Sequence, residues 1–81
     1  MFMHKVYILE SLKDKSRYIG VTINLANRLK EHNSGETKSN KSKIPYKLIW
    51  YCVFSNKLRA YEFERYLKSS SGYAFTKKHL I

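Results

Sequence analysis

Five side chains that lie far apart in the sequence could do chemistry together if the fold brings them to one place. They are two phenols, a guanidinium, an imidazole and a carboxylate: Tyr7, Tyr18, Arg28, His32 and Glu64. The planar fork of an arginine binds phosphate oxygens, and a tyrosine or a histidine can accept or relay a proton. Taken singly, a strand tyrosine usually packs in a core, and a single charged residue on a helix is usually solvated. The elements that position these side chains therefore decide whether they form a site.

Signatures of other catalytic and metal sites are absent from the sequence. It contains no CxxC, HExxH or P-loop motif. The three histidines, at positions 4, 32 and 79, are too scattered to indicate a zinc site. Asp14 is the only aspartate, and six acidic residues in all are too few for the carboxylate cluster of a two-metal site. No serine or cysteine stands out as the centre of a nucleophilic triad.

The charge of the chain favours a polyanionic partner. Sixteen Lys and Arg residues against six Asp and Glu residues give a formal net charge of +10 at pH 7. Nucleic acid is the commonest partner for such a chain, and an acidic membrane surface is the second candidate. Disorder is disfavoured because 43% of the residues are hydrophobic and 15% are aromatic.

Length and cysteine content limit the architecture. The 81 residues predict a single small domain that spans residues 1–81. Cys52 is the only cysteine and lies in an apolar run, so we expect a buried thiol, no internal disulfide and a reducing, cytoplasmic location. No run approaches the roughly 20 apolar residues of a membrane span, and residues 1–5 lack the apolar core of a signal peptide. We therefore expect an intracellular protein that does not enter a membrane.

The two tyrosines are predicted to lie on a hairpin. β-Branched and aromatic residues at 5–10 and 17–22 indicate two strands joined by a polar turn. Gly20 inside the second strand predicts a bulge or a close approach of backbone. After this hairpin the hydrophobic period changes from two to about 3.6, which predicts a helix from a cap at Thr22 or Asn24 to about residue 33.

That first helix carries Arg28 and His32, which are spaced by four residues and so share a polar row. The segment 34–45 is predicted to be a solvated basic loop with three lysines: Lys38, Lys41 and Lys43. Residues 47–54 are apolar nearly throughout, which predicts a third strand at the centre of a small sheet.

A second helix is predicted from a cap at Ser55 or Asn56 to about residue 68, ended by residues 69–72. Its buried stripe consists of Ala60, Phe63 and Leu67. Glu64 lies at the edge of that stripe, and residues 73–81 favour a short helix with Phe75 turned inward. Together these elements predict an α+β fold, a small three-stranded antiparallel sheet flanked by helices.

Four segments occur in an order that is specific as a set. They are Lys5-Val6-Tyr7, Tyr18-Ile19-Gly20, residues 24–35 and residues 60–68. In this order they resemble the motifs of the GIY-YIG nuclease family, as a small stand-alone member, over nearly the whole chain. Residues 24–35 resemble the family's L-x-x-R-L-x-x-H-N-x-G run, and residues 60–68 are similar to its A-x-x-x-E-x-x-L-K helix. A lysine and a valine replace the glycine and isoleucine of the first motif, whereas its tyrosine is retained.

The resemblance implies a metal-dependent endonuclease that hydrolyses phosphodiester bonds of DNA, one strand per active site, with low or structure-directed specificity. Glu64 would hold one divalent ion, Mg²⁺ or Mn²⁺ in its place. Arg28 would bind the phosphate, and Tyr7 or Tyr18 would activate or position the attacking water, with Tyr7 preferred as general base. His32 would hydrogen-bond a tyrosine or relay a proton.

The resemblance also bears on substrate contacts and partners. Gly20 would let backbone approach the site without a Cβ in the way, and four lysines would contact nucleic acid: Lys5, Lys38, Lys41 and Lys43. DNA is the expected partner, with RNA as an alternative, and a protein partner could supply specificity to a monomer or weak dimer. DNA repair is one role found among proteins that share this domain. Two other interpretations stay open: a non-catalytic nucleic-acid-binding module that keeps the fold and the charge, and an adaptor for a protein partner.

Overall fold

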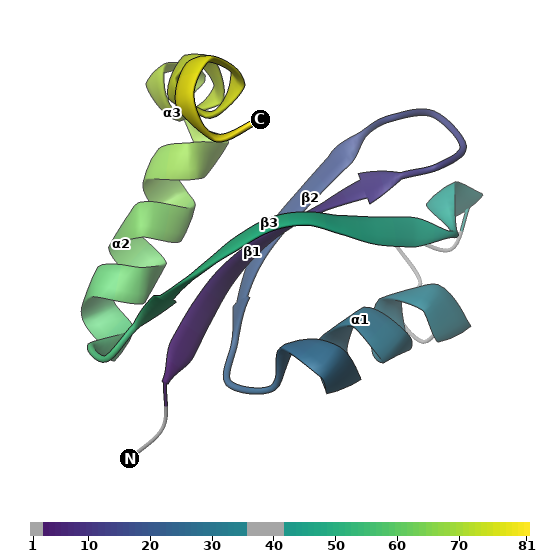
Figure 1. Ribbon diagram of the computed structural model, residues 1–81, viewed down its shortest axis with the longest axis horizontal. Coiled ribbons are helices and arrows are strands. Elements are labelled where there is room, and N and C mark those ends of the chain that lie inside the picture. The colour runs from purple at the N-terminus through teal and green to yellow at the C-terminus, as the bar shows by residue number, and fades with distance from the viewer. Residues whose placement is uncertain (1–2, 36–41) are drawn as a thin grey trace.

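The computed structural model describes residues 3–35 and 42–81, and the strands in these ranges form one antiparallel sheet in the order β2-β1-β3 (Figure 1). The strands are β1 (His4–Ser11), β2 (Arg17–Thr22) and β3 (Tyr46–Phe54). The helices are α1 (Leu25–Ser34), α2 (Lys57–Lys68), α3 (Ser70–Phe75) and the π-helix η2 (Thr76–Leu80). The expected α+β fold, a three-stranded antiparallel sheet flanked by helices, is confirmed for the described part of the chain.

The central strand is β1, and the prediction that β3 lies at the centre is wrong. β1 pairs on both sides, so that Tyr7 lies opposite Gly20 of β2 and opposite Tyr51 of β3. On the edge strand β3, Tyr51 and Val53 are nearly half exposed. An apolar run predicts that a strand packs against other elements but does not by itself fix the order of the strands.

The two faces of the sheet are covered by different helices, and Figure 1 shows α1 and α2 on opposite sides of it. Neighbouring residues of a strand point to opposite faces. Val6 and Ile8 of β1 form an apolar cluster with Leu67 of α2. The alternate residues Tyr7 and Leu9 form a second cluster on the face that α1 covers. The site residues of β1 and α1 therefore share one face.

Local signals at both ends fix the position of α1, as the sequence predicts. The side chain of Asn24 caps the helix by accepting the Asn27 N–H at 3.0 Å, and Gly35 ends it with a φ of 82°. Asn33 then ties the end of the helix to the start of β3. Its Oδ1 accepts the Tyr46 N–H at 2.7 Å, and its Nδ2 donates to the Tyr46 carbonyl at 3.1 Å.

The second face of the sheet is covered by α2, which begins after an Asn56 cap and buries Leu67 almost completely. The helix ends at Lys68 as predicted, but Gly72 lies within α3 rather than in a terminating segment. A Cβ at Gly72 would overlap the carbonyl oxygen of Tyr66, so α3 packs closely against the end of α2. Phe75 packs inward, as expected. Within the described ranges, no helix combines the length and the apolar character needed to cross a membrane.

Candidate active site

Tyr7 is the hub of the candidate site, and its place depends on Gly20. The phenol ring of Tyr7 lies across the backbone of Gly20, its partner on β2. A Cβ at position 20 would lie 2.5 Å from Tyr7 Oη and 2.7 Å from Tyr7 Cζ. Of the two expectations for this glycine, the structure shows a close approach, and the approaching group is the Tyr7 ring. The irregularity of the sheet lies elsewhere, between Ile8 and Leu9 where β1 pairs with β3.

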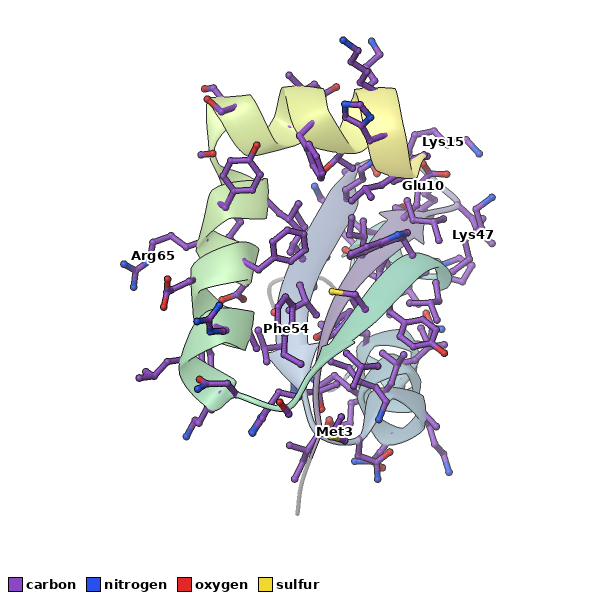
Figure 2. The ribbon with its side chains drawn as sticks, turned by 60° about the vertical axis from the view of Figure 1, so that its left-hand side comes forward. Met3, Glu10, Lys15, Lys47, Phe54 and Arg65 are labelled. Atoms are coloured by element: carbon purple, nitrogen blue, oxygen red, sulfur yellow. The ribbon has the colours of Figure 1, made fainter. Side chains whose placement is uncertain are left out.

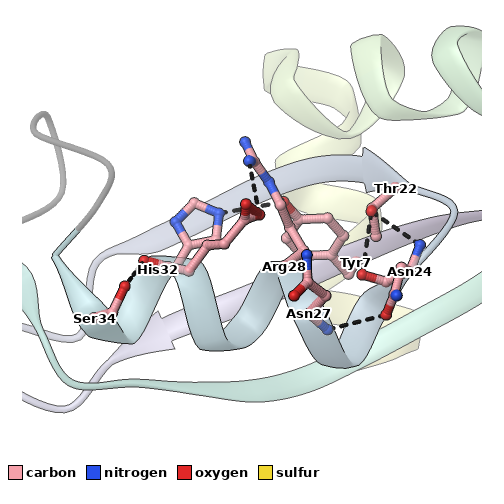
Figure 3. A network of polar contacts seen from close by, with 8 residues as sticks. Tyr7, Thr22, Asn24, Asn27, Arg28, His32 and Ser34 are labelled. Atoms are coloured by element: carbon pink, nitrogen blue, oxygen red, sulfur yellow. Dashed lines mark hydrogen bonds and ion pairs between the residues drawn. The ribbon is translucent and has the colours of Figure 1, made fainter.

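Helix α1 brings Arg28 and His32 to the same phenol (Figure 3). Arg28 Nε donates to Tyr7 Oη at 3.4 Å, and His32 Nε2 lies 3.3 Å from Tyr7 Oη. Residues four apart on a helix lie on one face, so the single helix positions both groups. Tyr7 and His32 are almost completely buried. The structure thus gathers three of the five predicted site residues around one oxygen atom.

Burial and the guanidinium set the protonation of this cluster. Burial, followed by the positive charge of Arg28, lowers the pKa of His32, so its imidazole is neutral near pH 7. Burial raises the pKa of Tyr7 despite the opposing hydrogen bond from Arg28. Hydrogen bonding to Tyr7 raises the pKa of Arg28 further above its usual range. Because the guanidinium can only donate, the Tyr7 oxygen accepts from Arg28, and the tautomer of the imidazole sets the direction of the hydrogen bond between Tyr7 Oη and His32 Nε2.

Two further tyrosines enclose His32. The Tyr18 ring centroid lies 4.5 Å from that of the imidazole and 6.3 Å from that of Tyr7. Tyr46, at the start of β3, is 5% exposed and its ring centroid lies 6.0 Å from that of His32. The sequence predicts Tyr18 as a site residue but not Tyr46, since an aromatic residue at the start of a strand is not distinctive. Tyr46 reaches the cluster through the contacts of Asn33 with its backbone.

Glu64 lies on α2, which packs against β1 and β2. Its side chain is 19% exposed, and its Oε2 accepts a hydrogen bond from Lys68 Nζ at 3.2 Å. The negative charge of Glu64 contributes to raising the pKa of Tyr7, so the carboxylate acts on the same phenol through the electrostatic field. The structure thus links the fifth predicted residue to Tyr7 through its charge alone, and the direct partner of Glu64 is Lys68.

A divalent ion would find few protein ligands here. No three His, Cys, Asp or Glu side chains gather into a metal-binding cluster within residues 3–35 and 42–81. Mg²⁺ needs fewer, since it keeps several waters and commonly takes one or two carboxylates together with substrate phosphates. The largely buried carboxylate of Glu64 fits the role of a single ligand, with Lys68 displaced from it.

The lysines predicted to contact nucleic acid are placed in different ways. Lys5 lies two residues before Tyr7 on β1 and so shares its face of the sheet. Lys43 Nζ is 3.7 Å from Asp14 Oδ2 at the hairpin turn, so its charge is partly engaged. Lys38 and Lys41 lie outside the described residues.

Comparison with known proteins identifies the class to which this fold and cluster belong. The model of the GIY-YIG catalytic domain matches residues 3–78, and the chain belongs to the GIY-YIG nuclease family. It is similar to a UPF0213 protein of Clostridium perfringens, with 43% identity over 67 residues that cover 82% of this chain and 71% of that protein. A UPF0213 protein of Bacillus licheniformis is 41% identical over 69 residues, which cover 84% of this chain and 70% of the relative.

A solved structure supports the same assignment. The solution NMR structure of a UPF0213 protein from Bacillus halodurans aligns with a TM-score of 0.58 and 33% sequence identity. The alignment covers 94% of this chain and 83% of that chain. The similarity in three dimensions thus spans the elements that carry the candidate site, from β1 to α2.

Proposed function

We propose that this protein is a metal-dependent endonuclease that hydrolyses phosphodiester bonds of DNA, one strand per active site. The proposal is carried by one observation: Arg28 and His32 share the hydroxyl of Tyr7 in a chain that belongs to a nuclease family. Such a cluster combines a phosphate-binding cation with a directed path for a proton. Specificity for sequence is low or follows the structure of the nucleic acid, because most contacts would be made to phosphates.

Arg28 binds the scissile phosphate in this proposal. Its side chain is 36% exposed and its Nη1 lies 3.4 Å from Glu31 Oε1, so the outer part of the guanidinium is accessible. A phosphate oxygen would replace the Glu31 carboxylate as the acceptor. Since the Arg28 Nε is held by Tyr7, the bound phosphate is placed next to the phenol.

Tyr7 acts as the general base without forming a lasting phenolate. Its oxygen takes a proton from the attacking water while its own proton passes to His32 Nε2, which a neutral imidazole can accept. Tyr7 is only 1% exposed, so the side chains around it must move slightly to admit the water while Arg28 Nε stays on Tyr7. Tyr18, which is half-buried, helps to position the water.

Glu64 would hold the divalent ion, Mg²⁺ or Mn²⁺. When bound, such an ion supplies positive charge to the phosphate and the leaving oxygen. Lys68 is the present partner of the carboxylate and would turn toward the nucleic acid.

Nuclease assays with paired variants test the proposal. The purified protein is incubated with supercoiled, flap and branched DNA, and with RNA of the same sequence, in Mg²⁺ or Mn²⁺ and with a chelator. We expect cutting of DNA that the chelator abolishes and that Glu64→Gln or Arg28→Ala reduces at least about a hundredfold. Glu62→Gln removes the same charge from an exposed position of α2 and should cut normally. Robust cutting by Glu64→Gln or in chelator would contradict the assigned site.

One observation favours a second candidate, a basic nucleic-acid-binding module without catalysis. The ion pair between Lys68 and Glu64 occupies the carboxylate that the metal needs. This candidate predicts salt-sensitive DNA binding with no cutting in either metal, and equal binding by Glu64→Gln and Glu62→Gln. The same assays therefore separate the two functions.

A further inference from the structure

A pocket of about 640 Å³ lies on the α2 side of the sheet, between the β1–β2 hairpin and the helices that end the chain. Its volume falls within the roughly 300–1,000 Å³ typical of pockets for small ligands. Ile8, Ile19 and Leu67 provide an apolar lining. Figure 2 shows Glu10 and Lys15, which also line it, at the end of the sheet beneath the C-terminal helices.

The pocket contains a guanidinium with unused hydrogen-bonding capacity. Arg17 Nη1 is buried and has no hydrogen-bond partner among the described residues. Arg17 Nε lies 3.9 Å from Glu10 Oε2, and the other oxygen of Glu10 lies 3.8 Å from Lys47 Nζ. A buried donor without an acceptor is unfavourable, so an anionic ligand toward which the 26% exposed Arg17 side chain turns would relieve that cost. Lys15 and Lys68 also line the pocket and add positive charge, whereas Glu10 lines it with a carboxylate.

Two residues connect this pocket with the candidate active site. Lys68 lines the pocket and donates to Glu64 at 3.2 Å. Tyr18 lines the pocket, and its ring packs against His32. Tyr18 belongs to the edge strand β2, so a strand of nucleic acid that passes round this edge would connect the Tyr7 cluster on the α1 face with the pocket on the α2 face.

We propose that the pocket binds a nucleotide next to the scissile phosphate, with its phosphate on Arg17 and its base against the apolar lining. This inference rests on the proposed nuclease function and specifies its substrate. Tyr73 lines the pocket and is 60% exposed, so its ring offers a stacking surface at the entrance. A base inside the pocket cannot remain stacked in a duplex. The substrate is therefore single-stranded or frayed beside the cut, and an intact duplex is disfavoured.

Binding of a mononucleotide tests the inference without metal or cleavage. Thymidine monophosphate, thymidine and inorganic phosphate are titrated separately into the protein while its amide NMR resonances are recorded. We expect thymidine monophosphate to shift residues 17–19, Leu67 and Thr76, and to bind more tightly than either fragment. Equal binding of inorganic phosphate, or shifts that avoid these residues, would overturn the proposal.

Matched arginine variants sharpen the result. Arg17→Ala should weaken binding of thymidine monophosphate at least about tenfold. Arg65→Ala, which removes the same charge from a side chain that points away from the sheet in Figure 2, should change it little. If Arg17→Ala does not fold, Tyr73→Ala at an exposed position carries the test, and it should abolish the advantage of the nucleotide over phosphate. Equal effects of Arg17→Ala and Arg65→Ala would show a general charge effect and refute the pocket.

A cleavage comparison separates this inference from the nuclease function itself. The wild-type protein should cut a flap faster than an intact duplex of the same sequence, and Arg17→Ala should reduce this preference. If the protein cuts the flap and the duplex at equal rates in the presence of metal, the inference about the pocket is wrong and the nuclease function is still supported. If the nucleotide binds in the pocket but no substrate is cut, the nuclease function is contradicted and binding by the pocket is still supported.

Discussion

The two faces of the sheet are stabilised in different ways. On the α2 face, the buried residues of the cluster are apolar throughout, with Ile8 and Leu67 among them. On the α1 face, the completely buried groups include Tyr7 and His32, whose polar atoms lie 3.3 Å apart. A buried polar group is tolerated only when it is hydrogen-bonded. The α1 face thus holds polar groups in a fixed geometry where apolar residues would stabilise the fold more simply, as expected of a functional site.

On the α2 side of the sheet, we expect the largest loss of stability when Gly72 is replaced. A Cβ there meets backbone of Tyr66 and Leu67, which cannot move without separating α3 from α2. We expect Gly72→Ala to lower the free energy of unfolding by about 3 kcal/mol, near the upper end for overpacking. Urea denaturation followed by circular dichroism measures the change, with Ser71→Ala at an exposed position as the control. A loss below that of the control would show that α3 is not held closely.

Gly20 provides the matching test on the α1 face. The three atoms nearest to such a Cβ all belong to the Tyr7 side chain, so the ring must shift but no backbone must move. Gly20→Ala should therefore cost less stability, about 1–2 kcal/mol. It should reduce DNA cleavage about a hundredfold, because the phenol leaves Arg28 and His32. Denaturation and cleavage rates of the folded variant are compared with those of Tyr51→Phe, which alters a half-exposed tyrosine opposite Tyr7 on β3. Full cleavage by Gly20→Ala would contradict the role of Tyr7.

The buried imidazole predicts a pH dependence that the apolar face lacks. Burial lowers the pKa of His32 below its usual 6.5, so the unfolded chain binds the proton more readily than the folded one. Stability should be fully present above about pH 6.5 and fall as the pH drops through the interval between that value and the lowered pKa. Among the residues that the structure describes, the charged or titratable groups near the imidazole include Arg28, Glu31, Tyr7, Tyr18 and Tyr46.

Urea denaturation at several pH values between 7.5 and 5 measures this loss. His32→Gln removes the titrating group, so its stability should change less with pH over the same interval. An unchanged slope in His32→Gln would assign the pH dependence to other groups. Asp14 does not interfere, because hydrogen bonds from Ser16 lower the pKa of its carboxyl to about 2.

The sequence predicts what depends on local signals. The caps Asn24 and Asn56 and the change of hydrophobic period define the helices. The spacing of Arg28 and His32 places both on one helix face, and the family motifs point to Tyr7. These features are encoded within a few residues of where they act.

The sequence does not predict features that depend on how the helices and strands pack against one another. The order of the strands follows from pairing, so the apolar sequence of β3 misleads. Tyr46 joins the site because β3 pairs with β1 and Asn33 holds the Tyr46 backbone. The pocket at Arg17 arises where α2 and α3 meet the hairpin. Such contacts link residues far apart in the chain that have no common motif.

The smallest expected effect is a change in DNA affinity when Glu31, whose carboxylate competes with the phosphate for Arg28, is replaced. Glu31 holds Arg28 Nη1 at 3.4 Å, in a pair whose two side chains are 36% and 34% exposed. An exposed ion pair contributes little, about 0–1 kcal/mol, so Glu31→Gln should tighten DNA binding only about two- to threefold. Fluorescence anisotropy with labelled DNA in the absence of metal measures this change.

Part of any gain would come from the added net positive charge alone. Glu62→Gln makes the same change of charge at an exposed position on α2, so the difference between the two variants isolates the release of Arg28. General attraction to DNA weakens with salt, whereas the advantage of Glu31→Gln over Glu62→Gln should persist as salt is raised. Identical affinities of the two variants at every salt concentration would mean that Arg28 is not the phosphate ligand, and the polar α1 face would then need another function.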